Sequence, residues 1–313
     1  MGVFVFLPLV LPLTAWPVAR LAEYRLHPHL ATLLLSAAAA VLGLCSTLCL
    51  ALLAIVGTAQ LPGNPLPDGW ADREVRAAVP HDAVVGKAAV CALALAGAAC
   101  AALLLRHRRV RRRAARALRG LPATQVAVLP DEVAYAHTLP GRGGRPGRIL
   151  VSTGMLGCLD SPERRALFAH ERAHLTGRHD RHLLLAGLAA RANPFLRPLR
   201  TAVAYTVERW ADEEAARAVG SRRITARAIA KAALVSRPDP APTLAAFAAP
   251  GGPVPRRVAA LLGPAPAART LPPMCTGVGV AVWTAAAGTT LSAMSSANSA
   301  VTMFLILKAA APL

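Results

Sequence analysis

The stretch Leu167–Asp180, LFAHERAHLTGRHD, carries the pattern H-E-x-x-H in His170, Glu171 and His174. Residues i and i+4 of a helix lie on the same face, so the two histidines can offer ring nitrogens to one ion. Glu171 falls at the edge of that face, where it can reach a metal-bound water without occupying a coordination position. The pattern therefore predicts two zinc ligands and one general base on a single helix.

The flanks of this stretch favour a helix built around the motif. Asp160 and Glu163 form a D-x-x-E capping box, Pro162 suits a first helical turn, and Gly177 is a typical stop. The alternative is a surface helix on which some of the chain's nine histidines happen to fall four residues apart. Because a start and a stop bracket the motif, we favour the metal site.

A catalytic zinc needs a third protein ligand, and the segment VERWADEEAARA offers one. Glu208 follows His174 by 34 residues, on a separate predicted helix. Asp212 lies one turn later on the same face and could hold a ligand histidine in the correct tautomer. Glu213 and Glu214 fall on other faces and are expected to be solvated. The sequence thus predicts one Zn²⁺ per chain.

The composition of the 313-residue chain is not that of a soluble protein. Hydrophobic residues make up 55% and charged residues only 16%, and the mean hydropathy is +0.44. The net charge of +19 is therefore concentrated at few positions. This balance indicates a membrane protein.

Four uncharged or nearly uncharged segments are long enough to cross a bilayer. The first contains three prolines; it lacks a basic start and a small-residue cleavage site, so an uncleaved span is favoured over a signal peptide. The last span is expected within the first 26 residues of its segment. The segments are residues 2–19, 30–59, 83–105 and 271–307.

Arginines predict how these spans are oriented. Residues 106–120 contain eight arginines directly after the third span, whereas the loop 61–82 carries four acids. The positive-inside rule then places the arginine run in the cytoplasm, and a bacterial plasma membrane is expected. Anionic lipid explains the run more simply than nucleic acid, so no direct nucleic-acid binding is expected.

The chain divides into a membrane region 1–119, with three spans and a basic juxtamembrane helix, a cytoplasmic domain 120–270, and a C-terminal span with a short tail, 271–313. The cytoplasmic domain is predicted to be α+β and mostly helical. It should contain a strand near Val126 and Val128, a hairpin formed by 132–137 and 149–156, helices at 182–191, 198–220, 222–235 and 256–262, and a Pro- and Ala-rich loop at 236–257.

The hairpin, the H-E-x-x-H helix and the later ERWAD together resemble the gluzincin membrane peptidases, both the M48 group and the M56 group that contains the β-lactam sensors. The resemblance covers about 120–262 and includes PVPRRVAALL near its end. It implies a zinc peptidase domain in which His170, His174 and Glu208 are the metal ligands, Glu171 the base and Asp212 the residue that supports a ligand.

Three spans before the domain and one after it resemble the M56 arrangement more than the M48 arrangement. The sequence contains neither S-x-x-K nor K-T-G, so β-lactam sensing is not expected. The edge-strand Asn of many M48 members is also missing. Tyr135 and His137 occupy the comparable region, which leaves the oxyanion-stabilising group unassigned.

Two further histidines, His179 and His182, follow Gly177 and are expected beyond the end of the motif helix, as solvated or supporting residues. The favoured function is a zinc endopeptidase that cleaves a protein or peptide substrate at the cytoplasmic membrane face. The M56 resemblance implies regulatory cleavage of a repressor, and the M48 resemblance implies turnover of misfolded membrane proteins. The alternative is a non-catalytic membrane sensor or scaffold.

Overall fold

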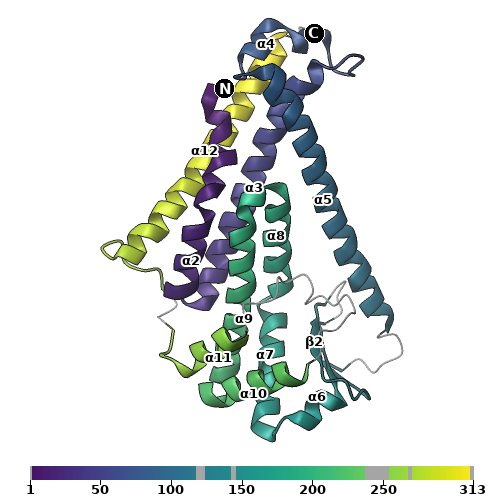
Figure 1. Ribbon diagram of the computed structural model, residues 1–313, viewed down its shortest axis with the longest axis vertical. Helices are drawn as coiled ribbons and strands as arrows, with labels where there is room; N and C mark the ends of the chain where they lie inside the picture. Colours follow the sequence, from purple (N-terminus) through teal and green to yellow (C-terminus); the bar gives the residue numbers. More distant parts are fainter. Residues whose placement is uncertain (1, 118–123, 142–145, 237–253, 267–269, 311–313) are drawn as a thin grey trace.

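The computed structural model describes residues 2–117, 124–141, 146–236, 254–266 and 270–310. Within these residues, four helical segments are long and apolar enough to cross a membrane, and they overlap the four predicted spans. Their bounds are Phe4–Arg25, Pro28–Ala59, Asp82–Arg116 and Gly277–Ala310. The chain is therefore a helical membrane protein (Figure 1).

The first span is built from short pieces because prolines interrupt its hydrogen bonding. Pro8, Pro12 and Pro17 fall in or between these pieces. The pieces are η1 (Gly2–Phe6), α1 (Leu7–Val10), η2 (Leu11–Thr14) and α2 (Ala15–Arg25).

The second and third spans, α3 (Pro28–Ala59) and α5 (Asp82–Ala117), meet at one end and separate towards the other. They touch where Gly57 faces Gly86, with backbones too close to leave room for a side chain. The short elements η3 (Asp68–Ala71) and α4 (Arg73–Ala77) join them at this end. Because α5 continues unbroken through most of the arginine run, the predicted juxtamembrane helix is an extension of the third span.

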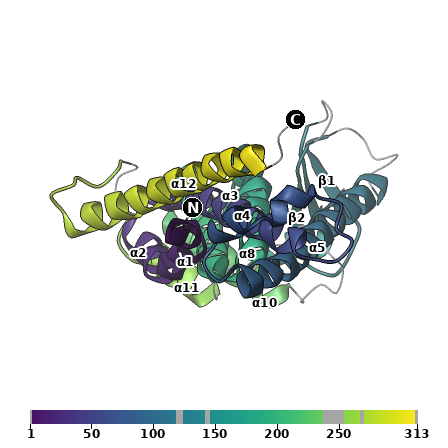
Figure 2. The same ribbon diagram turned by 90° about the horizontal axis from the view of Figure 1, so that it is seen from above.

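The last span, α12 (Gly277–Ala310), leans against the first two spans (Figures 1 and 2). The helix begins six residues later than the uncharged segment predicted at 271–307. It also continues beyond the first 26 residues of that segment, to which the sequence analysis assigned the span.

A helical hairpin fills the space between the diverging halves of α3 and α5 (Figure 1). It consists of α8 (His179–Ala192), η4 (Pro194–Leu196) and α9 (Arg197–Val219). The helix predicted at 182–191 therefore begins three residues earlier than expected.

Helix α8 runs parallel to α3, and contacting residues of the two helices keep nearly the same separation in sequence number. His182 Nδ1 lies 3.1 Å from Ser36 Oγ, and Asn193 at the hairpin tip donates from Nδ2 to Ser46 Oγ at 3.0 Å. The contact therefore extends over ten residues of α3, roughly 15 Å at 1.5 Å per residue. The hairpin thus penetrates well into the bundle of candidate membrane spans.

The descending helix α9 returns beside α2 and α3. Thr32 Oγ1 donates to Thr206 Oγ1 at 3.0 Å. Leu199, Val203 and Val207 are buried in one apolar core with residues of α2 and α3. The region 120–270 thus shares a core with the spans, and its boundaries as a cytoplasmic domain remain a prediction.

A three-stranded sheet lies beside α7, at the end of the molecule where α3 and α5 are far apart (Figure 1). The strands are β1 (Val126–Leu129), β2 (Ala136–Leu139) and β3 (Arg148–Ser152), in the order β1-β3-β2. The antiparallel pairing of β2 with β3 confirms that a hairpin forms here, but its first strand begins at Ala136 and not at Glu132, and β1 is parallel to β3. The second predicted arm was too long, because Ser152 accepts from Met155 N at 3.1 Å and starts α6 (Thr153–Cys158).

The motif helix α7 (Ser161–Thr176) begins with the predicted capping box and has Gly177 as its C-cap. It packs against α9 and α10 (Arg222–Val235), and α10 packs against α11 (Val254–Leu262). Most of the loop predicted at 236–257, residues 237–253, lies outside the described residues.

Candidate metal centre

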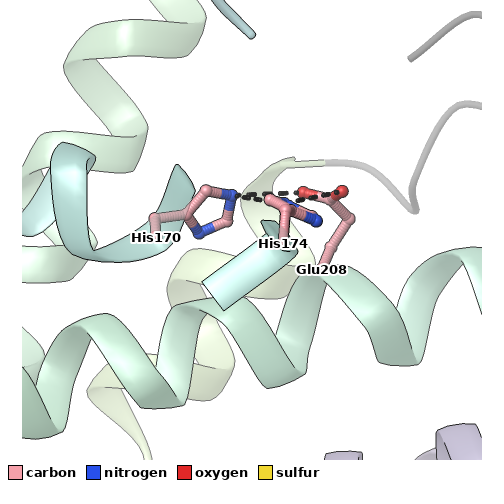
Figure 3. Close-up of side chains that lie close together, drawn as sticks. All are labelled: His170, His174 and Glu208. Carbon is pink, nitrogen blue, oxygen red and sulfur yellow. Dashed lines mark hydrogen bonds and ion pairs between the residues drawn. The ribbon is translucent and has the colours of Figure 1, made fainter. Parts of the chain in front are cut away.

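Helices α7 and α9 bring His170, His174 and Glu208 together (Figure 3). The two Nε2 atoms of the histidines are 3.1 Å apart. Glu208 Oε2 lies 3.6 Å from His170 Nε2, and Glu208 Oε1 lies 3.6 Å from His174 Nε2. The three residues predicted as metal ligands therefore form one compact group.

These distances suit a tetrahedral ion. Zinc binds His nitrogen and carboxylate oxygen at about 2.0–2.2 Å, so neighbouring ligand atoms of a tetrahedral site are about 3.3–3.5 Å apart. The 3.1 Å between the two Nε2 atoms is close to that edge length, and each Nε2 lies 3.6 Å from a different oxygen of Glu208. Two imidazoles and one carboxylate, with one position left for water, are also the donor set of a catalytic zinc site.

Asp212 lies behind the first histidine. Its side chain is fully buried, and Oδ1 lies 3.0 Å from His170 Nδ1, on the far side of the ring from the Nε2 atom that faces Glu208. This is the position predicted for a carboxylate that fixes the tautomer and orientation of a ligand histidine.

Arg257 of α11, to which the sequence analysis gave no role, joins both carboxylates of α9. Its Nε and Nη2 are 2.9 and 2.6 Å from the two oxygens of Asp212, and its Nη1 is 2.9 Å from Glu208 Oε2. The signal was present in PVPRRVAALL, a short helix with two arginines after the ligand helix. Nothing in the pattern indicated which carboxylates they would meet.

The charge of Arg257 sets the ionisation of these two acids. Burial alone would raise the pKa of each carboxyl group, but Arg257 and the neighbouring histidines together outweigh it. The pKa of Asp212 is lowered, and that of Glu208 falls well below its usual value. Both side chains are therefore held as carboxylates, as a metal ligand and its supporting acid must be.

The two ligand histidines differ in protonation although they are one turn apart. Burial opposes the charge on His170, but Asp212 and Glu208 raise its pKa to about 10. For His174, burial dominates and lowers the pKa to about 4. In the metal-free protein near neutral pH, His170 is thus protonated and His174 is neutral.

Glu171 is buried, and burial raises its pKa to about 7. It lines a cleft of about 240 Å³ whose other walls are mostly apolar and come from α7, α10 and β2. A carboxyl group whose pKa is close to neutral, at the edge of such a cleft, is suited to proton transfer.

The sequence analysis expected His179 beyond the motif helix, as a solvated or a supporting residue, and the structure contradicts the solvated alternative. His179 is the first residue of α8; it is buried, and its Nδ1 lies 2.8 Å from His174 Nδ1. Burial, with a contribution from His174, lowers its pKa to about 2. His182 is half-buried against Ser36, so it too has protein contacts.

Glu213 and Glu214 were also expected to be solvated, and the structure corrects this. Glu213 is buried and pairs with Arg209 at 3.1 Å and with Arg222 at 2.9 Å. Glu214 accepts from Trp210 Nε1 at 3.1 Å. Glu213 therefore meets α10 through Arg222, whereas Glu214 is half-exposed and meets partners on its own helix.

Tyr135 and His137 lie at the start of β2, an edge strand of the sheet. Their rings stack with centroids 5.6 Å apart. The residue between them, Ala136, lines the cleft beside Glu171. The structure does not assign either side chain to oxyanion stabilisation.

A comparison with protein families matches residues 105–192 to Peptidase family M48. The matched segment contains the H-E-x-x-H motif and ends before Glu208. Comparison with the curated proteins found no match, and comparison with the solved structures found none. The M48 similarity indicates a membrane-associated metallopeptidase, and it does not confirm the M56 placement.

We expect Gly177→Ala to destabilise the centre. A Cβ at position 177 would collide with the ring of His179 and lie 3.0 Å from Ala173 O, which would push His179 away from His174. Overpacking of this kind costs about 1–3 kcal/mol. Thermal unfolding and zinc content of the full-length protein measure both effects.

The matched control is Gly157→Ala in α6, where the added Cβ meets open space. That substitution should leave stability unchanged or slightly increased, because Ala favours helix. Equal unfolding curves for the two variants would contradict the packing argument.

Zinc binding should release protons in a pH-dependent number. A ligand histidine must be neutral, so His170 (pKa about 10) releases one proton across the neutral range. Glu171 (pKa about 7) is protonated at low pH and should ionise beside the bound ion. Release should be about two protons near pH 6, and Glu171→Gln should lower it to about one there, because the amide has no proton to lose.

Calorimetry in buffers of different ionisation enthalpy measures this number. Asp212→Asn removes a group that raises the pKa of His170, so release from the variant should be smaller above neutral pH. An unchanged count in Glu171→Gln near pH 6 would contradict the assigned protonation state of Glu171.

Proposed function

We propose that this protein is a membrane-embedded, zinc-dependent endopeptidase that cleaves protein substrates at the cytoplasmic face of a bacterial plasma membrane. One observation supports it above all: two histidines and a carboxylate lie close enough together to hold one ion, directly beside a buried glutamate that lines a mostly apolar cleft.

In this proposal His170, His174 and Glu208 hold the ion. When bound, zinc would polarise the scissile carbonyl and lower the pKa of a water molecule. Glu171 accepts the proton of that water and passes it to the leaving amine. Asp212 keeps the ring of His170 oriented, with its Nδ1 turned away from the ion.

The position of the centre relative to the spans indicates what it can reach. Asp180, next to His179, pairs with Arg111 of α5 at 3.2 Å. Arg111 lies five residues beyond Arg106, where the charged run begins, which is roughly 8 Å along the helix. The centre is thus close to the expected membrane surface, and peptide segments that lie next to a membrane are the substrates it reaches first.

The arginine run of α5 supports the cytoplasmic side through the positive-inside rule. For the physiological role, similarity to M48 supports a membrane metallopeptidase that either cleaves a repressor, the role that the M56 resemblance implied, or turns over membrane proteins.

Glu171→Gln should retain zinc and lose peptide cleavage by at least about a hundredfold, because the amide cannot take up a proton. The assay is hydrolysis of a casein-type substrate by the purified full-length protein, with zinc measured in the same sample. Glu132→Gln, an exposed glutamate on the loop before β2, is the matched control and should cleave normally. Normal cleavage by Glu171→Gln would refute the assigned base.

The sensor or scaffold alternative has a different outcome in the same experiment. If the zinc site were structural, the unmodified protein would bind metal and cleave no substrate. His174→Ala would then lose the metal, and hydrolysis would be absent from both proteins. Proteins that accumulate in cells carrying Glu171→Gln would then separate the two peptidase roles.

The cleft beside Glu171 should select the substrate side chain next to the scissile bond. Its walls include Ala228, Ile229 and Ala232 of α10, so it suits an apolar side chain. Ala232→Phe should lower kcat/KM for peptides with Leu or Phe at that position by about tenfold, and should spare those with Ala or Gly. Leu234→Phe, on the exposed face of the same helix, is the control. Equal effects on all peptides would contradict this assignment.

A further inference from the structure

Three arginines at the tip of the α8–α9 hairpin form a positive cluster without an acidic partner. Arg191 ends α8, and Arg197 and Arg200 lie in the first turn of α9. None of the ion pairs formed within the described residues involves any of the three. Arg191 and Arg197 are close enough for their charges to act on Arg200.

Most hydrogen-bond donors of the cluster lack partners, and its charges lack counter-ions. Arg200 is half-buried, and its Nε is buried without a partner. Arg191 donates only to Gly187 O, an acceptor within its own helix, at 3.3 Å. Most guanidinium N–H groups of the cluster are therefore available to a ligand.

The cluster lies deep in the bundle of spans, so the lack of partners for its charges is important. Leu188 O, one turn before Arg191, contacts Cys100 of α5. Arg106, the first charge of the arginine run, lies six residues farther along α5. Arg191 is therefore roughly 14 Å deeper in the bundle than Arg106.

The other two arginines lie nearer the surface. Ala189 and Leu196 both pack against Gly43 of α3, so they are at similar depth. Arg200 follows Leu196 by one turn, roughly 6 Å, which leaves it about 5 Å deeper than Arg106 and much nearer the surface than Arg191. The cluster thus extends from the membrane surface into the region that apolar lipid chains occupy, where an unpaired charge is costly.

We propose that this cluster is a binding site for the phosphate of an anionic phospholipid in the leaflet on the side of the metal centre. A phosphodiester at the level of Arg200 offsets one of the three positive charges of the cluster. The planar guanidinium groups can each donate two hydrogen bonds to its oxygens. The acyl chains extend beside the hairpin, between the other spans. The ligand therefore carries a charge opposite to that of the cluster, accepts hydrogen bonds from its free donors and lies at its depth.

This site is distinct from the metal centre. Twelve residues of α8 separate His179 from Arg191, roughly 18 Å of helix. Failure of the lipid proposal would leave the peptidase proposal intact, and the converse also holds.

The test uses full-length protein in bilayer nanodiscs of phosphatidylcholine alone or mixed with phosphatidylglycerol, followed by native mass spectrometry at high salt. High salt screens the exposed arginines of α5 more than a recessed site. The unmodified protein should retain phosphatidylglycerol in preference to phosphatidylcholine. Arg191→Gln/Arg200→Gln should reduce that retention by about 30-fold, at about fivefold for each arginine.

The matched control is Arg109→Gln/Arg113→Gln, which removes the same charge from the exposed face of α5 and should retain the lipid. Arg191→Lys/Arg200→Lys keeps the charge without the planar fork and should retain an intermediate amount, which separates ligand loss from misfolding. Normal zinc content of each variant confirms that it is folded.

Three results would overturn the proposal. Equal retention by the glutamine variant and the unmodified protein would show that the arginines do not hold lipid, as when an acidic segment of another protein covers them. Equal retention of phosphatidylcholine would remove the requirement for an anionic lipid. Displacement by millimolar inorganic phosphate would make the ligand a soluble anion.

Discussion

The bridge from Arg257 to Glu208 and Asp212 is the interaction on which the centre depends. It holds two buried carboxylates ionised in a place where burial alone would neutralise them. Without metal, protonated His170 and Arg257 balance these two charges, while burial favours the neutral form of Glu171. With a divalent ion bound, His170 becomes neutral and an ionised Glu171 restores the balance. The same charge balance that admits the ion therefore also produces the carboxylate that the proposed reaction needs as a base.

The centre is assembled from two sides of the molecule. Helix α7 carries both histidines and packs on the sheet, whereas α9 carries Glu208 and packs on α2 and α3. The adjacent Arg256 extends this connection, since it pairs with Glu23 of α2 at 2.7 Å while Arg257 binds the carboxylates of α9. All three ligands lie between the third and the last span, but Glu208 is carried by a helix that shares an apolar core with α2 and α3. The geometry of the three ligands depends on how α9 is seated among the spans.

Local sequence patterns predicted those parts of the site that lie on one helix face. The spacing of His170 and His174, the pair Glu208 and Asp212, and the capping box of α7 all follow from helical periodicity. The contacts of Arg257 were not predicted because its partners are distant in sequence. The contact of His179 with His174 was not predicted because it depends on the turn at Gly177. The position of the α8–α9 hairpin among the membrane spans was missed for a different reason. Its arginines lower the hydropathy of both arms, so a pattern that identifies spans from uncharged runs could not place it among them.

The arginines of the α8–α9 hairpin also explain why it can enter the bundle without crossing the membrane. Its apolar faces pack on α3, and Asn193 at the tip is satisfied by Ser46 Oγ and Leu9 O. The backbone is thus paired where it turns, as a re-entrant segment requires. The guanidinium groups remain at the edge, where an anionic headgroup can meet them. A hairpin held by lipid at its tip and by α3 along its length keeps Glu208 at a fixed depth. The proposed peptidase would then act on whatever chain passes close to that depth.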